Sequence, residues 1–357
     1  MTDFTQNQVQ QRLDENNVPY AILLLGNGAS VLICQYGGRI LGPFLTQDSG
    51  ALFWLNDVWK ERTAFHNFIA ERGWNLGGER MWVAPEIQYF VRDRQDFLGS
   101  YSLQPELDPG QYRLTQIHAS TWQLQQHMNL AVYSAGDSPK LLTATRQIRP
   151  APNPLDALSA CDALMAGVVY AGYEQAITLS DSAPNHVLSA TWSLIQVKPG
   201  GDVLIPASPM VETTVYIPPA QANFQTIANG HVRIPITGRS SFKVGFKAAH
   251  VTGRAAYVQA LSDGRVALFV RNFHNNPSAI YAEEPANLPG GIGQSTFVYN
   301  DDGNLGGFGE LECLGQAIGG QSGSSQQTDL LQLWMYVGDK TRINNIATHL
   351  LGFPAQV

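Results

Sequence analysis

Apolar runs of five to eight residues, separated by turn-forming residues, recur along most of the chain. Asn, Asp and Gly tolerate the positive φ angles that tight hairpin turns require. Two pairs of apolar runs flank such turns: residues 20–25 and 29–34 around Gly26-Asn27-Gly28, and residues 256–261 and 265–270 around Ser262-Asp263-Gly264. The pattern therefore predicts two antiparallel hairpins.

Further strands are predicted from the remaining apolar runs. In Val168–Leu179 the odd positions are mostly apolar, a period of two that indicates a strand with one buried face. The other predicted strands are Trp122–Leu124, Leu141–Ile148, Val187–Val197, Phe242–Phe246, Phe297–Tyr299, Leu311–Leu314 and Leu330–Val337. Helical patterns are few: Gln8–Leu13, Trp59–Ile69 and Asn153–Leu164. Strands do not alternate regularly with helices, which argues against a doubly wound parallel sheet.

Composition agrees with a strand-rich globular chain. Of 357 residues, 44% are hydrophobic and 14% charged, and 34 Gly and 20 Pro are spread between the apolar runs. The best candidate for a domain boundary is Arg149–Pro154, but the sequence on both sides is of the same strand-rich kind. We therefore expect an all-β chain, a large antiparallel β-sandwich with a few short helices, forming one domain over residues 1–357.

The charge balance and the lengths of the apolar segments argue against a nucleic acid partner and a membrane partner. The chain has 22 Lys and Arg against 29 Asp and Glu, and no basic block that would neutralise a nucleic acid backbone. The N-terminal residues lack the pattern of a secretory signal, and no segment approaches the ~18 apolar residues that span a membrane. We expect a cytoplasmic protein with no nucleic acid or membrane partner, while the oligomeric state stays open.

Known cofactor motifs are missing. Gly26-Asn27-Gly28 lacks the third glycine of a dinucleotide-binding loop, at Val31, and a strand rather than a helix is predicted to follow it. The histidines show no metal-ligand spacing, and the three cysteines, Cys34, Cys161 and Cys313, are far apart, which fits reduced thiols. We therefore expect neither a cofactor nor a metal ion.

The segment Gly73–Glu86 combines glycines, tryptophans and charged residues. Paired glycines let a backbone approach a ligand, Trp82 offers a flat apolar face for a sugar ring, and Glu79, Arg80 and Glu86 can bind hydroxyl groups. The alternative interpretation is a tight turn with a Glu–Arg pair on the surface and a tryptophan in the core.

The segment Phe308–Gly315 places Glu310 and Glu312 two positions apart, so that on a strand both carboxylates share one face. Leu311 and Cys313 would then share the other face and enter the core. Two neighbouring like charges raise the pKa of one group, which can leave an acid and a base in one cleft. The alternative is a solvated outer face of a sheet.

These segments, in this order, resemble the galactose mutarotase-like superfamily of aldose 1-epimerase-like proteins, and in particular a bacterial branch with GGxRxWxAPE early and GELExLG late. Gly37-Gly38-Arg39-Ile40 and Thr191-Trp192-Ser193 fall where that superfamily has comparable runs. The resemblance implies a β-supersandwich whose concave sheet binds carbohydrate, a hexose or a derivative. It adds Arg39 and Trp192 to Glu79, Arg80, Trp82 and Glu86 as candidate substrate-binding residues.

The resemblance also implies cofactor-free acid–base chemistry, in which a glutamate removes the proton of the anomeric hydroxyl and a histidine protonates the ring oxygen. The glutamate corresponds to Glu312, with Glu310 as its neighbour. The histidines are not matched: Leu76-Gly77-Gly78 stands where the family has His-Gly-Gly, and a second His position is also replaced. His186 is a candidate acid, and His274 is a candidate acid or binding residue.

We therefore expect a carbohydrate-binding protein of this fold. Isomerase activity of the 1-epimerase kind would need another proton donor, because the histidines of the family are not matched in this sequence. The alternative is a non-enzymatic module that binds or senses a sugar or sugar phosphate. We expect interconversion of anomers to be absent or very slow.

Overall fold

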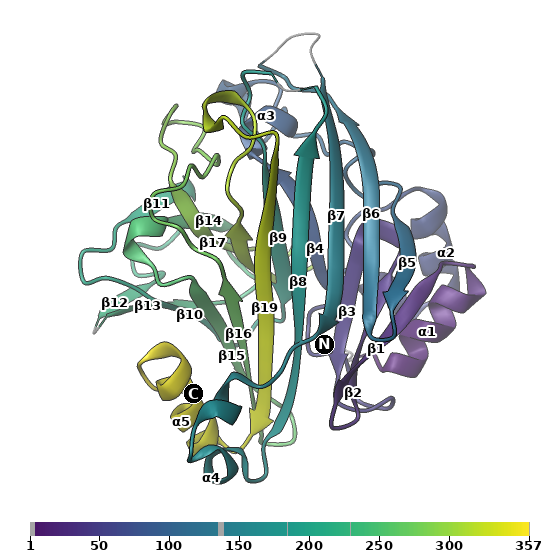
Figure 1. The fold of residues 1–357 in the computed structure, drawn as a ribbon, viewed down its shortest axis with the longest axis vertical. Coiled ribbons are helices and arrows are strands. Elements are labelled where there is room, and N and C mark those ends of the chain that lie inside the picture. The colour runs from purple at the N-terminus through teal and green to yellow at the C-terminus, as the bar shows by residue number, and fades with distance from the viewer. Residues whose placement is uncertain (1–3, 135–138, 184, 229, 357) are drawn as a thin grey trace.

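The computed structural model describes residues 4–134, 139–183, 185–228 and 230–356, and its strands pair into two large antiparallel sheets (Figure 1). The nine-stranded sheet has the order β1 (Tyr20–Gly26), β2 (Ala29–Cys34), β3 (Arg39–Phe44), β4 (Glu79–Ala84), β9 (Ala190–Val197), β18 (Gly309–Leu314), β17 (Gln294–Asn300), β14 (Phe242–Lys247) and β11 (Thr213–Ile217). The ten-stranded sheet has the order β12 (Thr226–Ala228), β13 (His231–Pro235), β10 (Asp202–Pro206), β15 (Arg254–Ala260), β16 (Val266–Phe273), β19 (Gln326–Gly338), β8 (Val169–Asp181), β7 (Lys140–Pro150), β6 (Thr121–Leu130) and β5 (Arg113–His118). The predicted all-β sandwich is confirmed.

Both predicted hairpins are present. β1 pairs with β2 and β15 with β16, each antiparallel. Asn27 has φ 52° and Gly28 φ 78°, the left-handed conformation that Asn and Gly adopt most readily. In β8 the odd positions from Ala171 to Leu179 are buried, as the period of two predicted.

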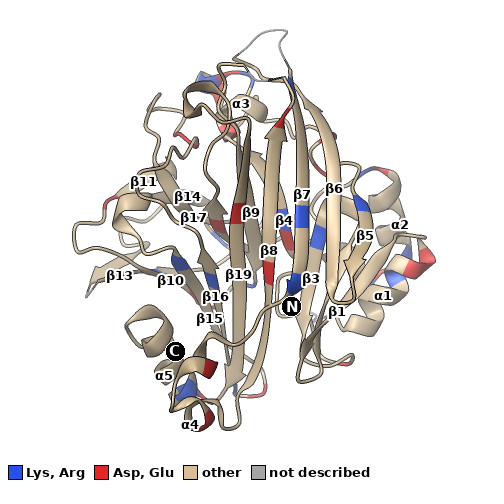
Figure 2. Cartoon of the chain, viewed as in Figure 1, with Lys and Arg blue, Asp and Glu red and all other residues tan. Residues whose placement is uncertain are grey.

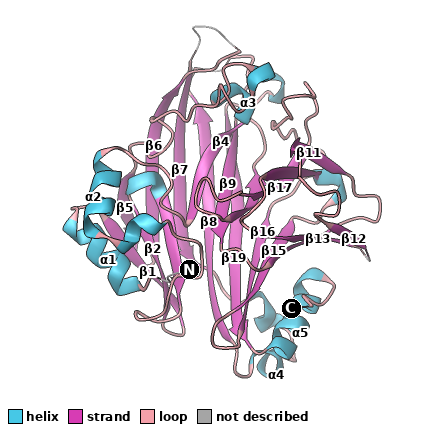
Figure 3. Cartoon of the chain, turned by 180° about the vertical axis from the view of Figure 1, so that it is seen from behind, coloured by secondary structure: helices cyan, strands magenta, loops and turns pink. Residues whose placement is uncertain are grey.

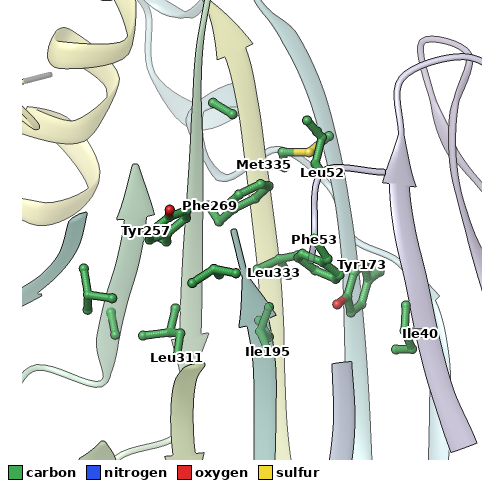
Figure 4. Close-up of a cluster of buried hydrophobic side chains, with 14 of the residues drawn as sticks. Ile40, Leu52, Phe53, Tyr173, Ile195, Tyr257, Phe269, Leu311, Leu333 and Met335 are labelled. Atoms are coloured by element: carbon green, nitrogen blue, oxygen red, sulfur yellow. The ribbon is translucent and has the colours of Figure 1, made fainter. Parts of the chain in front are cut away.

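The main core lies between the two sheets (Figure 4). Every second side chain of a strand points into this layer, because side chains alternate between the two faces of a sheet. Figure 4 shows members from both sheets meeting there, among them Ile40, Ile195, Leu311, Tyr173, Phe269 and Leu333.

Short helices lie at the margins of the sheets (Figure 3). α1 (Gln6–Glu15) and α2 (Arg62–Ala70) pack on the outer face of β2 and β3, while α5 (Lys340–Leu351) packs on the outer face of β15, β16 and β19. α3 (Glu86–Tyr89) and α4 (Cys161–Met165) are single turns. No helix in the described ranges combines the length and apolarity needed to cross a bilayer.

The helix α5 is not among the elements predicted from the sequence. It begins after Asp339, whose side chain accepts a hydrogen bond from the backbone N–H of Arg342, and ends at Gly352 in the left-handed conformation. Ile343, Ile346 and Leu350 pack against the ten-stranded sheet. The predicted helix over Asn153–Leu164 is instead a 3₁₀ turn, Pro154–Ala157, followed by α4.

Candidate functional site

A cavity of about 460 Å³ lies on the outer face of the nine-stranded sheet, the face turned away from the other sheet. Its position follows from strand alternation. Ile195 and Leu311 point into the core between the sheets, whereas Leu194, Glu310 and Glu312 point to the opposite face and line the cavity.

The strand register brings distant segments together at this cavity. Arg80 on β4 lies opposite Leu194 on β9, and Leu194 lies opposite Glu312 on β18. Trp82 and Trp192 are also partners across β4 and β9, with ring centroids 5.9 Å apart. The two sequence segments singled out for their chemistry therefore line one face of three adjacent strands.

Arg80 forms an ion pair with Glu310, with 2.7 Å between Nη1 and Oε1. Both side chains are almost fully buried, so neither lies on a solvated sheet face. The Arg80 guanidinium also lies 4.1 Å from the ring centroid of Trp82 and 5.4 Å from that of Trp74. Such cation–π contacts orient the guanidinium in addition to its ion pair.

Lys243 on β14 is a second cation of the cavity. Its Nζ lies 2.6 Å from Oε2 of Glu86 and 4.1 Å from the ring centroid of Trp192. The Tyr101 hydroxyl donates a hydrogen bond to the other oxygen of Glu86, over 3.0 Å. Burial opposes the charge of Lys243, but Glu86, Glu312 and the buried Glu283 together raise its pKa above the ordinary value.

Glu312 differs from the other carboxyl groups that line the cavity because, among the described residues, it forms no ion pair. Its Oε2 accepts a hydrogen bond from the Trp192 indole over 2.9 Å. Burial raises the pKa of Glu312 to about 8; Lys243 opposes this rise, and Glu310 and Glu86 add to it. At neutral pH this carboxyl group therefore holds its proton.

A further carboxyl group, Glu283, lies behind Glu86. Its Oε2 accepts a hydrogen bond from the backbone N–H of Glu86 over 2.7 Å, and the side chain is almost fully buried. Burial raises the pKa of Glu283 to about 8, with Lys243 lowering it and Glu86 raising it. Glu283 therefore fixes the position of Glu86 without adding a full negative charge at pH 7.

Arg39 lies beneath the cavity and does not line it. It forms a buried ion pair with Asp108, 2.7 Å between Nη2 and Oδ2, and the same oxygen accepts a hydrogen bond from the Trp82 indole over 2.8 Å. Burial raises the pKa of Asp108, although Arg39 and the indole N–H oppose this rise. Arg39 thus holds the Trp82 ring in place through Asp108.

Glu79 lies on the other face of β4 from Arg80 and is buried between the sheets. Its Oε1 accepts hydrogen bonds from Ser193, Gln175 and Arg271, over 2.8, 2.7 and 2.5 Å. Burial alone would raise the pKa of Glu79, but Arg271 and Arg146 lower it below the ordinary value. Figure 2 shows charged residues of both signs on the central strands.

The two candidate histidines lie outside the cavity. His186 is exposed and precedes β9, which begins at Ala190 rather than at the predicted Val187. His274 follows β16 and lines a different depression, of about 560 Å³, together with Glu174 and Gln332. Trp82, Glu86, Arg80, Trp192, Glu310 and Glu312 all line the first cavity.

Comparison with known proteins gives a likeness of fold. No protein-family model and no curated protein matches the chain by sequence. Among solved structures, a galactose mutarotase-like protein from Lactobacillus casei aligns with 12% identity and a TM-score of 0.45, covering 90% of this chain and 99% of that one. The chain resembles galactose mutarotase-like proteins.

Two further structures give the same result. A galactose mutarotase related enzyme from Lactobacillus acidophilus aligns at 8% identity with a TM-score of 0.48, covering 90% of this chain and 98% of that one. The GalM/aldose epimerase homologue from C. elegans aligns at 6% identity with a TM-score of 0.43, covering 90% of this chain and 99% of that one. These likenesses concern the fold alone.

Several cavity residues were not predicted from the sequence. Lys243 lies in an apolar run, where a single lysine gives no sign that it points into a cavity. Trp74 and Phe308 lie inside the segments Gly73–Glu86 and Phe308–Gly315 but were not predicted to bind a ligand. Tyr101 and Tyr299 lie outside these segments. Their only signal in the sequence is their aromatic character, which core residues share.

Among the described residues, no group of three or more His, Cys, Asp or Glu side chains is arranged to hold a metal ion. The cysteines at 34, 161 and 313 are free thiols, of which Cys34 and Cys313 are buried, as expected for reduced cysteines. The side chains that line the cavity carry carboxyl, amine, guanidinium, phenol and indole groups.

Proposed function

We propose that this cavity binds a carbohydrate. The observation that carries the proposal is the combination of aromatic rings with buried hydrogen-bonding groups in one cavity: Trp82, Trp192 and Tyr101 line it together with Arg80, Glu310 and Glu312. Apolar rings suit the C–H face of a sugar, and charged side chains bind its hydroxyl groups strongly. The volume, about 460 Å³, lies within the range of about 300–1,000 Å³ usual for small-molecule sites.

The charges of the cavity favour an uncharged sugar over a sugar phosphate. Both cations that line it, Arg80 and Lys243, already have a carboxylate partner, Glu310 and Glu86. A phosphate would have to displace one of these carboxylates and leave it buried without a partner, which costs several kcal/mol.

The test is calorimetric titration with glucose and galactose, comparing Trp192→Phe with the unaltered protein. The substitution keeps an aromatic ring but removes the indole N–H that donates a hydrogen bond to Glu312. We expect sugar affinity to fall about tenfold, because the cavity loses part of its apolar lining and the Glu312 carboxyl group loses the donor that orients it.

Trp334→Phe is the matched control. Trp334 is buried against α5, far from the cavity in the sheet order, and its indole nitrogen has no hydrogen-bond partner among the described atoms. Sugar binding that is equally weakened by both substitutions, or absent in the unaltered protein, would contradict a carbohydrate site in this cavity.

A second candidate function is a diverged aldose 1-epimerase. It is favoured by the unequal state of two neighbouring carboxyl groups: Glu312 holds a proton at pH 7, and Glu310 is paired with Arg80. With its pKa raised to about 8, Glu312 would act as the acid and not as the base that the resemblance implies: it would give its proton to the ring oxygen while Glu310 takes the proton of the anomeric hydroxyl, so that the C1–O5 bond breaks and a C1 carbonyl forms. The reverse steps close the ring on either face.

We expect this interconversion to be absent or very slow. Glu310 is already bound to Arg80 by an ion pair, and neither candidate histidine lines the cavity, so part of the typical ~10²–10⁴-fold contribution of acid–base catalysis is missing. Polarimetry of freshly dissolved α-glucose and α-galactose measures it directly. Fast interconversion that Glu312→Gln abolishes would instead make the epimerase the main function.

A further inference from the structure

The cavity is charged at its floor and apolar at its opening. Arg80, Glu310 and Glu312 are only 2%, 4% and 1% exposed. Leu98 and Leu305 also line the cavity, yet they are 73% and 42% exposed. Side chains that both line a cavity and face solvent lie where it opens.

The two leucines come from separate loops, and each loop is fixed to the body of the protein. Leu305, between β17 and β18, donates its backbone N–H to Asp301 over 3.2 Å and accepts a hydrogen bond from Asn75 over 2.9 Å. The loop of Leu98 follows Arg94, whose guanidinium binds Glu284 over 2.8 Å and the Ala286 carbonyl over 2.6 Å.

Further apolar side chains from the same two loops line the cavity. Phe97 and Leu103, from the loop of Leu98, line the cavity, and so does Phe308, from the loop of Leu305. Phe308 is 1% exposed and packs on Trp54, with 4.6 Å between ring centroids. Apolar side chains of both loops thus line the cavity, some of them exposed to solvent and others buried.

We propose that the natural ligand is a glycoside with an apolar aglycone, whose sugar lies on the charged floor and whose aglycone lies between Leu98 and Leu305. This inference rests on the proposed carbohydrate site and names the class of sugar it takes. A free hexose would use only the floor and leave both leucines in water. A fatty acid would bring a carboxylate to a floor that already holds Glu86, Glu310 and Glu312.

The experiment compares methyl, phenyl and octyl glucosides, in both anomeric forms, by calorimetric titration below the micellar concentration of the octyl compound. Covering about 60 Å² of apolar surface, at about 25 cal/mol per Å², corresponds to about tenfold in affinity. We expect the phenyl or octyl glucoside to bind at least tenfold more tightly than the methyl glucoside of the same anomeric form.

The variant Leu98→Ser/Leu305→Ser should reduce this preference to about threefold or less and leave methyl glucoside binding unchanged. Both side chains are exposed, so the substitutions remove little core packing. The control is Leu24→Ser/Leu288→Ser, at two leucines that are 70% and 54% exposed and do not line the cavity. It should keep the full preference.

Three results separate the ways of failing. Equal affinity for all three glucosides, or a preference that survives in the Leu98/Leu305 variant, overturns the aglycone site but leaves the carbohydrate site standing. Phenol or 1-octanol binding as tightly as the corresponding glucoside overturns the carbohydrate site, because the sugar then contributes nothing. Absence of binding by every glucoside, glucose and galactose overturns both.

Discussion

At the scale of single residues, the partners of each carboxyl group decide what it can do. Glu310 and Glu312 are two positions apart on one strand, and both are buried. Glu310 pairs with Arg80 through an ion pair, whereas Glu312 forms no ion pair with the described residues and accepts a hydrogen bond from the Trp192 indole. Similar positions in sequence therefore give two carboxyl groups with different partners, and burial raises the pKa of Glu312 to about 8.

The protonated state of Glu312 predicts a dependence of stability on pH. Its pKa is about 8 in the folded protein against an ordinary 4.5, so between these values the folded state binds more protons than the unfolded state. The contribution of this group to the free energy of unfolding is fully present below about pH 4.5. It is lost as the pH rises toward 8, by about 1.4 kcal/mol per pH unit.

Glu312→Gln should remove one such contribution. We expect the free energy of unfolding of this variant, measured with urea between pH 5 and 8, to fall less steeply with pH than that of the unaltered protein. The same change at the exposed Glu106 is the control and should leave the slope as it was. An unchanged slope in Glu312→Gln would show that this carboxyl group is ionised at pH 7.

At the scale of elements, strand register determines which residues meet. The pairing of β4 with β9 and of β9 with β18 puts Arg80 and Glu312 on either side of Leu194, although they are far apart in the chain. A shift of one residue in either pairing would turn these side chains toward the core. The segment from α3 to Leu103 and the loop before β18 then add Glu86, Leu98 and Leu305 around the same face.

At the scale of the whole molecule, a buried polar cluster connects the two sheets. Glu79 on β4 belongs to the nine-stranded sheet, and its partners Arg271 on β16 and Gln175 on β8 belong to the ten-stranded sheet. Tyr173 also donates a hydrogen bond to Glu79. Each of these groups is almost fully buried and depends on the others to satisfy its charge or hydrogen bonds.

Arg271→Met should therefore destabilise the protein by about 3–5 kcal/mol, because it leaves the Glu79 carboxylate buried without its nearest cation. Urea-induced unfolding measures the change. Arg149→Met is the matched control: Arg149 pairs with Glu174, but its side chain is 63% exposed, and a surface pair is worth about 0–1 kcal/mol. Equal losses in the two variants would mean that the cluster does not join the sheets energetically.

The sequence by itself determined the class of fold and part of the site. Period-two runs and turn residues depend on local conformation, so both hairpins and the sandwich class could be predicted from them. The shared face of Glu310 and Glu312 also follows from strand alternation alone. The helix α5 was not predicted, although the N-cap Asp339, the C-terminal Gly352 and the helical spacing of Ile343, Ile346 and Leu350 are local signals of a helix.

Only the tertiary structure decided which charged residues share the cavity. Arg80 and Glu79 are adjacent in sequence, yet one lies in the cavity and the other between the sheets. Lys243 joins the cavity through the pairing of β14 with β17, and His186 and His274 lie outside it. The physical reason is that pairing between distant strands, and the loops that cover them, depends on contacts across the whole chain, which no local pattern of residues records.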